Sequence, residues 1–215
     1  MEIKLNRLAR GYFENIQNTD PRLAAHCRIL AQRLNGVTSR TQAFRLLAEV
    51  VSSTRECSAL VLQYDFASQE LALMSATGAL SGAIYRATNA TPLLAEVLTK
   101  RVPLLIPNIE SVRTTSVKER IERTGEFIDN ENCRIVMAGK SLAYPRRLIR
   151  AALPHTLTAG TALFYAIPTL IKDFPSQGLV IEHRPGSKRI DPKYIRYGES
   201  LARLFALETQ HLRFE

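Results

Sequence analysis

Basic side chains dominate one stretch of the chain and are its best candidates for binding chemistry. Between Glu131 and Asp173 the sequence contains no acidic residue. An arginine side chain offers a planar fork of N–H donors that matches carboxylate and phosphate oxygens. If the residues around Tyr144 form one short helix, several of these side chains face a single anion. The predicted anion-binding or nucleic-acid-binding residues are Lys140, Arg146, Arg147 and Arg150. A solvated basic loop is the alternative, and both interpretations stay open.

The sequence supports thiol or metal chemistry less well than it supports anion binding. The three cysteines, Cys27, Cys57 and Cys133, are widely spaced and form no CxxC pair. Only Cys133 is expected to be exposed, where Arg134 could lower its pKa. A thiol enzyme acting through Cys133 is therefore a remote alternative. The four histidines do not pair at ligand spacing, and no phosphate-binding glycine loop is present. We predict no catalytic residue and no metal site, and the sequence names no cofactor.

Length and charge set the bounds for these sites. The chain has 215 residues, 46% of them hydrophobic, which is enough for one large domain. Its 29 basic and 20 acidic residues give a formal charge of +9, which favours anionic partners or simply keeps the protein soluble. The first residues lack the apolar core of a signal peptide, and no apolar run is long enough to span a bilayer. We expect a cytoplasmic protein with free thiols.

Start signals and periodicity predict the elements that position these residues. Asp20-Pro21 and Ser39 each begin a helix, and Asp191-Pro192 begins a long helix that runs to the end. Residues 59–64 and 70–75 form a hairpin. The other predicted elements are helices at 93–100 and 117–123, a helical turn near 144–150, a strand or loop at 133–138, and strands at 102–106, 161–167 and 178–183.

Three stretches of sequence carry a resemblance to a known family. They are "LLAEVLTKRVPLLIPNI", "GTALFYAIPTLIKDFPSQGLVIEHR" and "IDPKYIRYGESLARLFALETQHL". In this order they resemble the helix with its short strand, the central hairpin and the closing helix of the GAF domain, a relative of the PAS sensory fold.

The resemblance implies an α+β fold. It has a central antiparallel sheet of five or six strands, flanked by N- and C-terminal helices, with a basic insertion before the last two strands. Residues 1–19 would be an N-terminal extension and residues 20–215 a single domain, with the insertion at about 111–159. The short strand 102–106 would lie at the sheet edge beside a ligand pocket, where Pro103 and Pro107 are tolerated. We expect helices on one side of the sheet and the insertion over the other.

Resemblance and charge together also suggest particular site residues. Asn108 stands where the family often has Asp, so a hydrogen-bonding group is kept and a carboxylate is lost. The predicted ligand-binding residues are Tyr85, Arg86, Ile106, Asn108, Arg134, Tyr144, Arg147 and Tyr165. Terminal helices of such domains commonly pair between copies, which predicts a homodimer. Its predicted contacts are Leu23, Leu30, Leu34, Leu201 and Phe205, unless these side chains merely cover the sheet of a monomer.

The leading functional hypothesis is a non-catalytic sensory or regulatory module. It binds a small ligand, such as an anion or a nucleotide, and signals through an unidentified protein partner. The alternative is a nucleic-acid or protein adaptor that uses the basic segment 134–172. Bilin attachment is not expected, because Cys133 is followed by Arg134 instead of the histidine that accompanies the chromophore cysteine in bilin-binding relatives.

Overall fold

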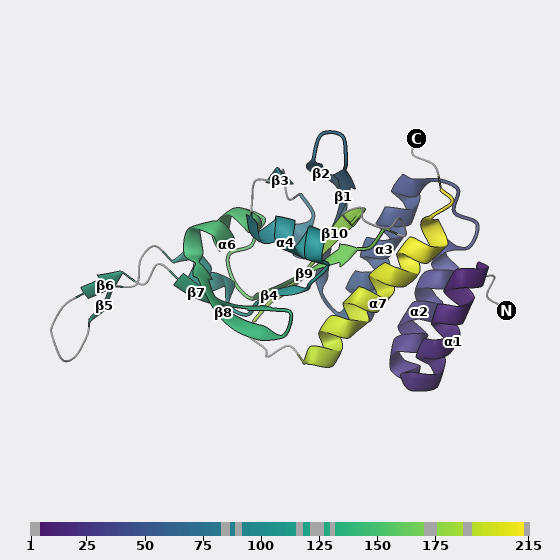
Figure 1. Ribbon diagram of the computed structural model, residues 1–215, viewed down its shortest axis with the longest axis horizontal. Helices are drawn as coiled ribbons and strands as arrows, with labels where there is room; N and C mark the ends of the chain where they lie inside the picture. Colours follow the sequence, from purple (N-terminus) through teal and green to yellow (C-terminus); the bar gives the residue numbers. More distant parts are fainter. Residues whose placement is uncertain are drawn as a thin grey trace.

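One antiparallel sheet separates two layers of helices in the computed structural model, which confirms the predicted α+β class (Figure 1). The structure describes residues 5–82, 87–88, 92–114, 118–120, 127–129, 132–169, 176–186 and 191–212. The helices are α1 (Arg7–Thr19), α2 (Pro21–Leu34), α3 (Arg40–Arg55), η1 (Gly78–Leu80), α4 (Pro92–Lys100), α5 (Ile109–Arg113), α6 (Arg146–Ala152) and α7 (Pro192–Thr209). The strands are β1 (Ser58–Asp65), β2 (Glu70–Ala76), β3 (Ala87–Thr88), β4 (Leu104–Ile106), β5 (Lys118–Arg120), β6 (Phe127–Asp129), β7 (Asn132–Met137), β8 (Lys140–Pro145), β9 (Thr161–Ile167) and β10 (Gly178–Arg184).

The main sheet is larger than the sequence predicts. Among the described residues, eight strands pair in the order β3-β2-β1-β10-β9-β4-β7-β8, and each pair is antiparallel. The expected five or six strands are too few because the insertion itself supplies β7 and β8. The insertion does precede the last two strands, β9 and β10, as predicted. It also contains the separate pair β5–β6, so the helix predicted at 117–123 is wrong for residues 118–120.

Strand β4 is an interior strand, and its predicted place at the sheet edge is wrong. Leu104 pairs with Phe164 of β9 on one side and with Met137 of β7 on the other. The flanking prolines lie outside the three-residue strand, so they limit its length without removing a donor from either ladder. The prolines therefore explain why the strand is short, but they do not place it at an edge.

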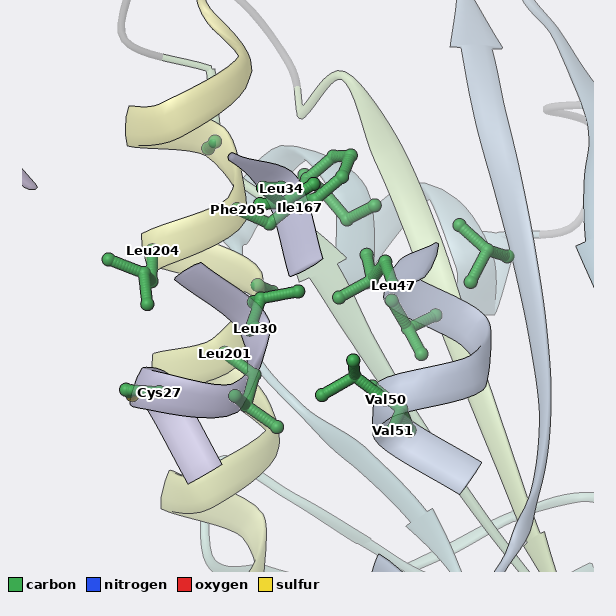
Figure 2. Close-up of a cluster of buried hydrophobic side chains, with 14 of the residues drawn as sticks. Cys27, Leu30, Leu34, Leu47, Val50, Val51, Ile167, Leu201, Leu204 and Phe205 are labelled. Carbon is green, nitrogen blue, oxygen red and sulfur yellow. The ribbon is translucent and has the colours of Figure 1, made fainter. Parts of the chain in front are cut away.

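Alternating side chains of the strands divide the core between the two faces of the sheet. In β1, Ala59 and Val61 pack with helices α1, α2, α3 and α7, whereas Leu60 and Leu62 pack with α4, α5 and α6. Figure 2 shows the first of these clusters, where side chains from α2, α3, α7 and β9 meet. Helix α4 therefore lies on the same face as the insertion, and the expected division into a helical side and an insertion side holds only in part.

Helix α1 belongs to the helical layer although it falls within the predicted N-terminal extension. Its side chains Ala9, Phe13 and Ile16 are buried in the cluster that α2 and α7 share. Asn6 caps the helix and donates from Nδ2 to the carbonyl of Leu207 in α7 at 2.6 Å. The boundary between an extension and a domain at residue 20 stays a prediction.

Candidate ligand-binding cleft

The residues predicted to bind a ligand lie on both faces of the sheet. Ile106 is buried in the cluster beneath α4 and α6, whereas Tyr165 is buried in the cluster beneath α7. Asn108 is exposed, and its side chain caps α5 by accepting from the backbone N–H of Ser111 at 3.0 Å. Arg134 and Arg147 are exposed on β7 and α6, and Tyr144 is half-buried on β8. Tyr85 and Arg86 lie outside the described residues.

Tyr165 takes part in a buried polar network that joins α7 to the sheet. Its hydroxyl donates to Oε1 of Glu182 at 2.7 Å, and Nε of Arg55 donates to the same oxygen at 2.6 Å. Burial, and then the charge of Glu182, raises the pKa of Tyr165, so its hydroxyl stays a donor. Gly198 of α7 lies so close that a Cβ there would meet the tyrosine ring at 2.7 Å. The network fixes how α7 sits on the sheet.

Two of the predicted anion-binding arginines, together with Arg113, donate to main-chain carbonyls inside the insertion. Arg146 donates to the carbonyl of Thr114 at 3.0 Å, and Arg150 donates to that of Val112 at 3.1 Å. Arg113 donates to the carbonyls of Pro154 and Leu157 at 2.7 and 2.9 Å. We call Arg113, Arg146 and Arg150 the insertion arginines.

Cys133 is buried, so its predicted exposure is wrong. It is 7% exposed, accepts from Nε of Arg146 at 3.2 Å and lies 3.4 Å from the carbonyl of Ser111. Cys27 and Cys57 are also free and buried. Burial, and then the charge of Asp20, raises the pKa of Cys27 to about 12. The three thiols are therefore packed inside the protein, away from solvent.

The predicted dimer contacts lie in the core of the single chain. Figure 2 shows four of them, on α2 and α7, directed into one cluster. The five side chains are at most 8% exposed: Leu23, Leu30, Leu34, Leu201 and Phe205. Within the single chain these residues cover the sheet. A homodimer stays a prediction, but these five side chains are not available to form its surface.

A cleft of about 520 Å³ opens between α1, α7 and the end of β9. Four of its residues come from α7 and one from α1, while the corner after α4 and the segment after β9 close the opposite wall. Three arginines contribute, and we call them the cleft arginines. The lining consists of Tyr12, Arg101, Ala166, Pro168, Thr169, Arg196, Glu199, Ser200 and Arg203. None of these residues is among the predicted site residues.

Contacts within the cleft hold two of its arginines at opposite walls. The guanidinium of Arg203 lies 5.0 Å from the ring centre of Tyr12, a cation–π arrangement. Arg101 donates from Nη2 to the hydroxyl of Thr169 at 3.3 Å. Arg101 also adopts a left-handed backbone conformation, with φ at 52°, directly after the last residue of α4. Glycine is the usual residue at such a helix end, so an arginine here carries a conformational cost.

Among the described residues that line the cleft, Glu199 is the one carboxylate. It is half-buried, and this burial raises its pKa, while the charge of Arg196 opposes the rise. Ser200, the next residue, hydrogen-bonds the phenol of Tyr12, whose pKa is nevertheless raised by burial. The lining residues that the structure describes therefore combine three positive charges with one negative charge and several hydroxyl groups.

Sequence reasoning missed the cleft because its residues come from four separate parts of the chain. One local signal exists in α7, where Arg196, Glu199, Ser200 and Arg203 follow the spacing of one helix face. A second signal is the basic residue at the sharp break after residue 100. Neither signal indicates that the two segments meet, because that meeting depends on how α7 crosses the sheet.

The described residues show neither a metal site nor a membrane-spanning helix. Among them, no three side chains of His, Cys, Asp or Glu come together in a group that could hold a metal ion. The same residues include no helix that is both long and apolar enough to cross a membrane.

Comparisons with solved structures identify the fold. The GAF domain of a phosphoenolpyruvate-protein phosphotransferase from Coxiella burnetii matches with a TM-score of 0.56 and 16% identity, over 89% of this chain and 94% of that one. The corresponding Acinetobacter domain matches at 0.59 and 12%, over 89% and 94%. A phycoerythrobilin-bound GAF domain from a cyanobacterial phytochrome matches at 0.55 and 9%, over 87% and 96%.

The chain therefore has the GAF domain fold, as its sequence suggests. Identities of this size establish the fold alone. No protein-family model matches the sequence, and no curated protein matches it either.

Proposed function

We propose that this protein is a non-catalytic sensory or regulatory module that binds a small anionic ligand in the cleft between α1 and α7. The observation that carries the proposal is the convergence of Arg101, Arg196 and Arg203 on one cavity. A cleft of about 520 Å³ has the size of small-molecule sites in proteins. Solved domains with this fold include one bound to a bilin, which supports a ligand-binding role.

The position of the cleft suggests how binding could be signalled. Its walls include Tyr12 of α1 and four residues of α7, which are the first and last helices of the described residues. Tyr194 and Gly198 of α7 also contact the buried network around Glu182. A ligand that bridges the walls of the cleft would tie both terminal helices to the end of β9. We propose that a protein partner reads this change on the terminal helices.

Native mass spectrometry of freshly purified protein tests the proposal. We expect a retained anionic metabolite in the unchanged chain and its loss when the three cleft arginines are replaced together by alanine. The matched control replaces Arg134, Lys140 and Arg147, which removes the same charge from exposed positions in the insertion. If the control variant loses the ligand and the cleft variant keeps it, the cleft is not the site.

The same pair of variants addresses nucleic-acid binding. The hypothesis of an adaptor that uses residues 134–172 stays a prediction, and it requires an affinity for DNA or RNA that falls steeply with added salt. In that case the insertion variant, but not the cleft variant, should lose affinity and reduce the slope with salt. A chain that binds no anionic metabolite but shows this pattern would contradict the proposed function.

A further inference from the structure

Glu199 lies between two arginines along the side of α7 that lines the cleft. Arg196 and Arg203 precede and follow it by three and four residues, so all three side chains share one face of α7. Within the described part of the chain, no ion pair within 4.0 Å and no hydrogen bond involves the Glu199 carboxylate. The carboxylate lines the same cleft as the three arginines and is half-buried, so it can accept a hydrogen bond from a donor group on a ligand that the arginines hold.

We propose that the ligand of the cleft is amphoteric. It carries a carboxylate or phosphate group that binds the cleft arginines, and an ammonium or other N–H group that donates to the carboxylate of Glu199. This inference rests on the proposed function and adds the chemical class of the ligand. Amino acids with acidic side chains and aminoalkyl phosphates are the simplest molecules of this class.

The order of charges along α7 supports this class over a plain dianion. Arg203 follows Arg196 by seven positions, which corresponds to about 10 Å along the helix axis. Glu199 stands between them, so a ligand lying along this wall meets positive, negative and positive charge in turn. A dianion of that length would place an anionic group or its apolar middle against Glu199. An amphoteric molecule places a donor there.

Two arginines of the cleft are positioned by different neighbouring side chains. Arg203 is held against the ring of Tyr12 on one wall, and Arg101 is held by Thr169 on the other. The guanidinium of Arg203 is exposed and carries five N–H donors, so it can turn to an anion while it stays over the ring. Ala166 and Pro168 supply an apolar surface between them. The cleft can thus hold the anionic group at its two walls while Glu199 selects for the donor.

Two matched pairs of probes test the inference by isothermal titration calorimetry on the full chain. The first pair is L-glutamate and glutarate, and the second is 2-aminoethyl phosphate and ethyl phosphate. Within each pair the anionic group is kept and the ammonium is removed. The unchanged protein should bind the amino member of at least one pair at least about tenfold more tightly than its partner. The pair that shows this preference identifies the anionic group as carboxylate or phosphate.

Glu199→Gln separates selection by this carboxylate from general attraction to the arginines. The variant keeps the shape of the side chain but removes its charge, so we expect the preference to fall to about equal affinity within the pair. Equal or tighter binding of glutarate and ethyl phosphate by the unchanged protein would overturn the inference. If that binding still depends on the cleft arginines, the proposed function stands. If none of the four probes binds at millimolar concentration, the inference is overturned. The probes then give no support to the cleft as the ligand site.

Discussion

Two groups of arginines in this protein have the same chemistry but different surroundings. The insertion arginines donate to main-chain carbonyls at distances of 2.7–3.3 Å, so the fold itself uses their side chains. The cleft arginines line a cavity and leave much of their surface open to solvent. The difference teaches that a count of basic residues locates positive charge, whereas the atoms facing each guanidinium decide whether it supports the fold or is available to bind a ligand.

The surroundings of the insertion explain why its arginines serve the fold. Helix α5 has only five residues, and the segment after α6 is irregular, so several carbonyls there have no helical partner. Buried carbonyls need donors, and one guanidinium can satisfy two of them. Burial, and then the charge of Arg150, lowers the pKa of Arg113. Nearby like charges are tolerated because carbonyl dipoles surround them.

The largest effect on stability is expected for a substitution among the insertion arginines. Arg146→Ala removes a side chain that is 9% exposed and that donates to Thr114 and Cys133. We expect a loss of about 2–3 kcal/mol in the free energy of unfolding, because the variant loses a packed side chain and leaves the buried sulfur of Cys133 without its donor. Arg203→Ala, in the cleft, should change that free energy by less than about 0.5 kcal/mol. Urea unfolding of both variants, followed by circular dichroism, measures the two values.

A similar loss in both variants would contradict the distinction between the two groups. Ligand affinity provides the reverse measurement on the same proteins. Arg203→Ala should weaken binding of the retained anion, and Arg146→Ala should leave its affinity unchanged wherever the variant is folded.

An intermediate effect is expected at Arg101, where the backbone is left-handed with φ at 52°. Glycine adopts this conformation without strain, so Arg101→Gly should raise the free energy of unfolding by up to about 1 kcal/mol. The same change removes one wall of the charged cleft and should weaken anion binding about tenfold or more. Thermal unfolding without ligand and calorimetry with ligand measure the two effects. A variant that is less stable and binds normally would show that Arg101 serves the fold.

The sequence predicts the helices and strands more accurately than it predicts which of them lie side by side. Helix caps at Asp20, Ser39 and Asp191 are local signals, and each predicted helix begins there. The hairpin of β1 and β2 was also predictable, because its two strands are adjacent in the chain. Strand β4 was placed wrongly because its neighbours β9 and β7 come from distant segments, and short strands with prolines are typical of edges as well.

The candidate site was less predictable than the fold. Arg146 and Arg150 were singled out by local charge, yet the carbonyls that they contact follow from the path of α5. Arg101 and Arg203 are far apart in sequence, and they line one cleft only because α7 crosses the sheet near the end of β9. Contacts of this kind depend on packing between elements, which periodicity and capping do not encode.

The smallest expected effect concerns Glu199 and its dependence on pH. The groups around it are Arg196 and Arg203 on the same helix, Tyr12 on α1 and Arg101 on the opposite wall. Burial raises the pKa of Glu199, although the charge of Arg196 opposes the rise. When the folded pKa of an acid is raised, stability falls as pH rises from the unfolded pKa through the folded pKa, because the fold disfavours the ionised form.

Glu199→Gln should therefore stabilise the protein without ligand by about 0.5 kcal/mol at about pH 7, a small value because the carboxylate is half exposed. At about pH 3 the carboxyl is protonated in both states, so the difference should disappear. Urea unfolding at the two pH values measures it. A carboxylate that reduces stability when the cleft is empty but improves selection of an amphoteric ligand is retained for binding. If Glu199→Gln instead destabilises the protein at both pH values, Glu199 supports the fold as the insertion arginines do.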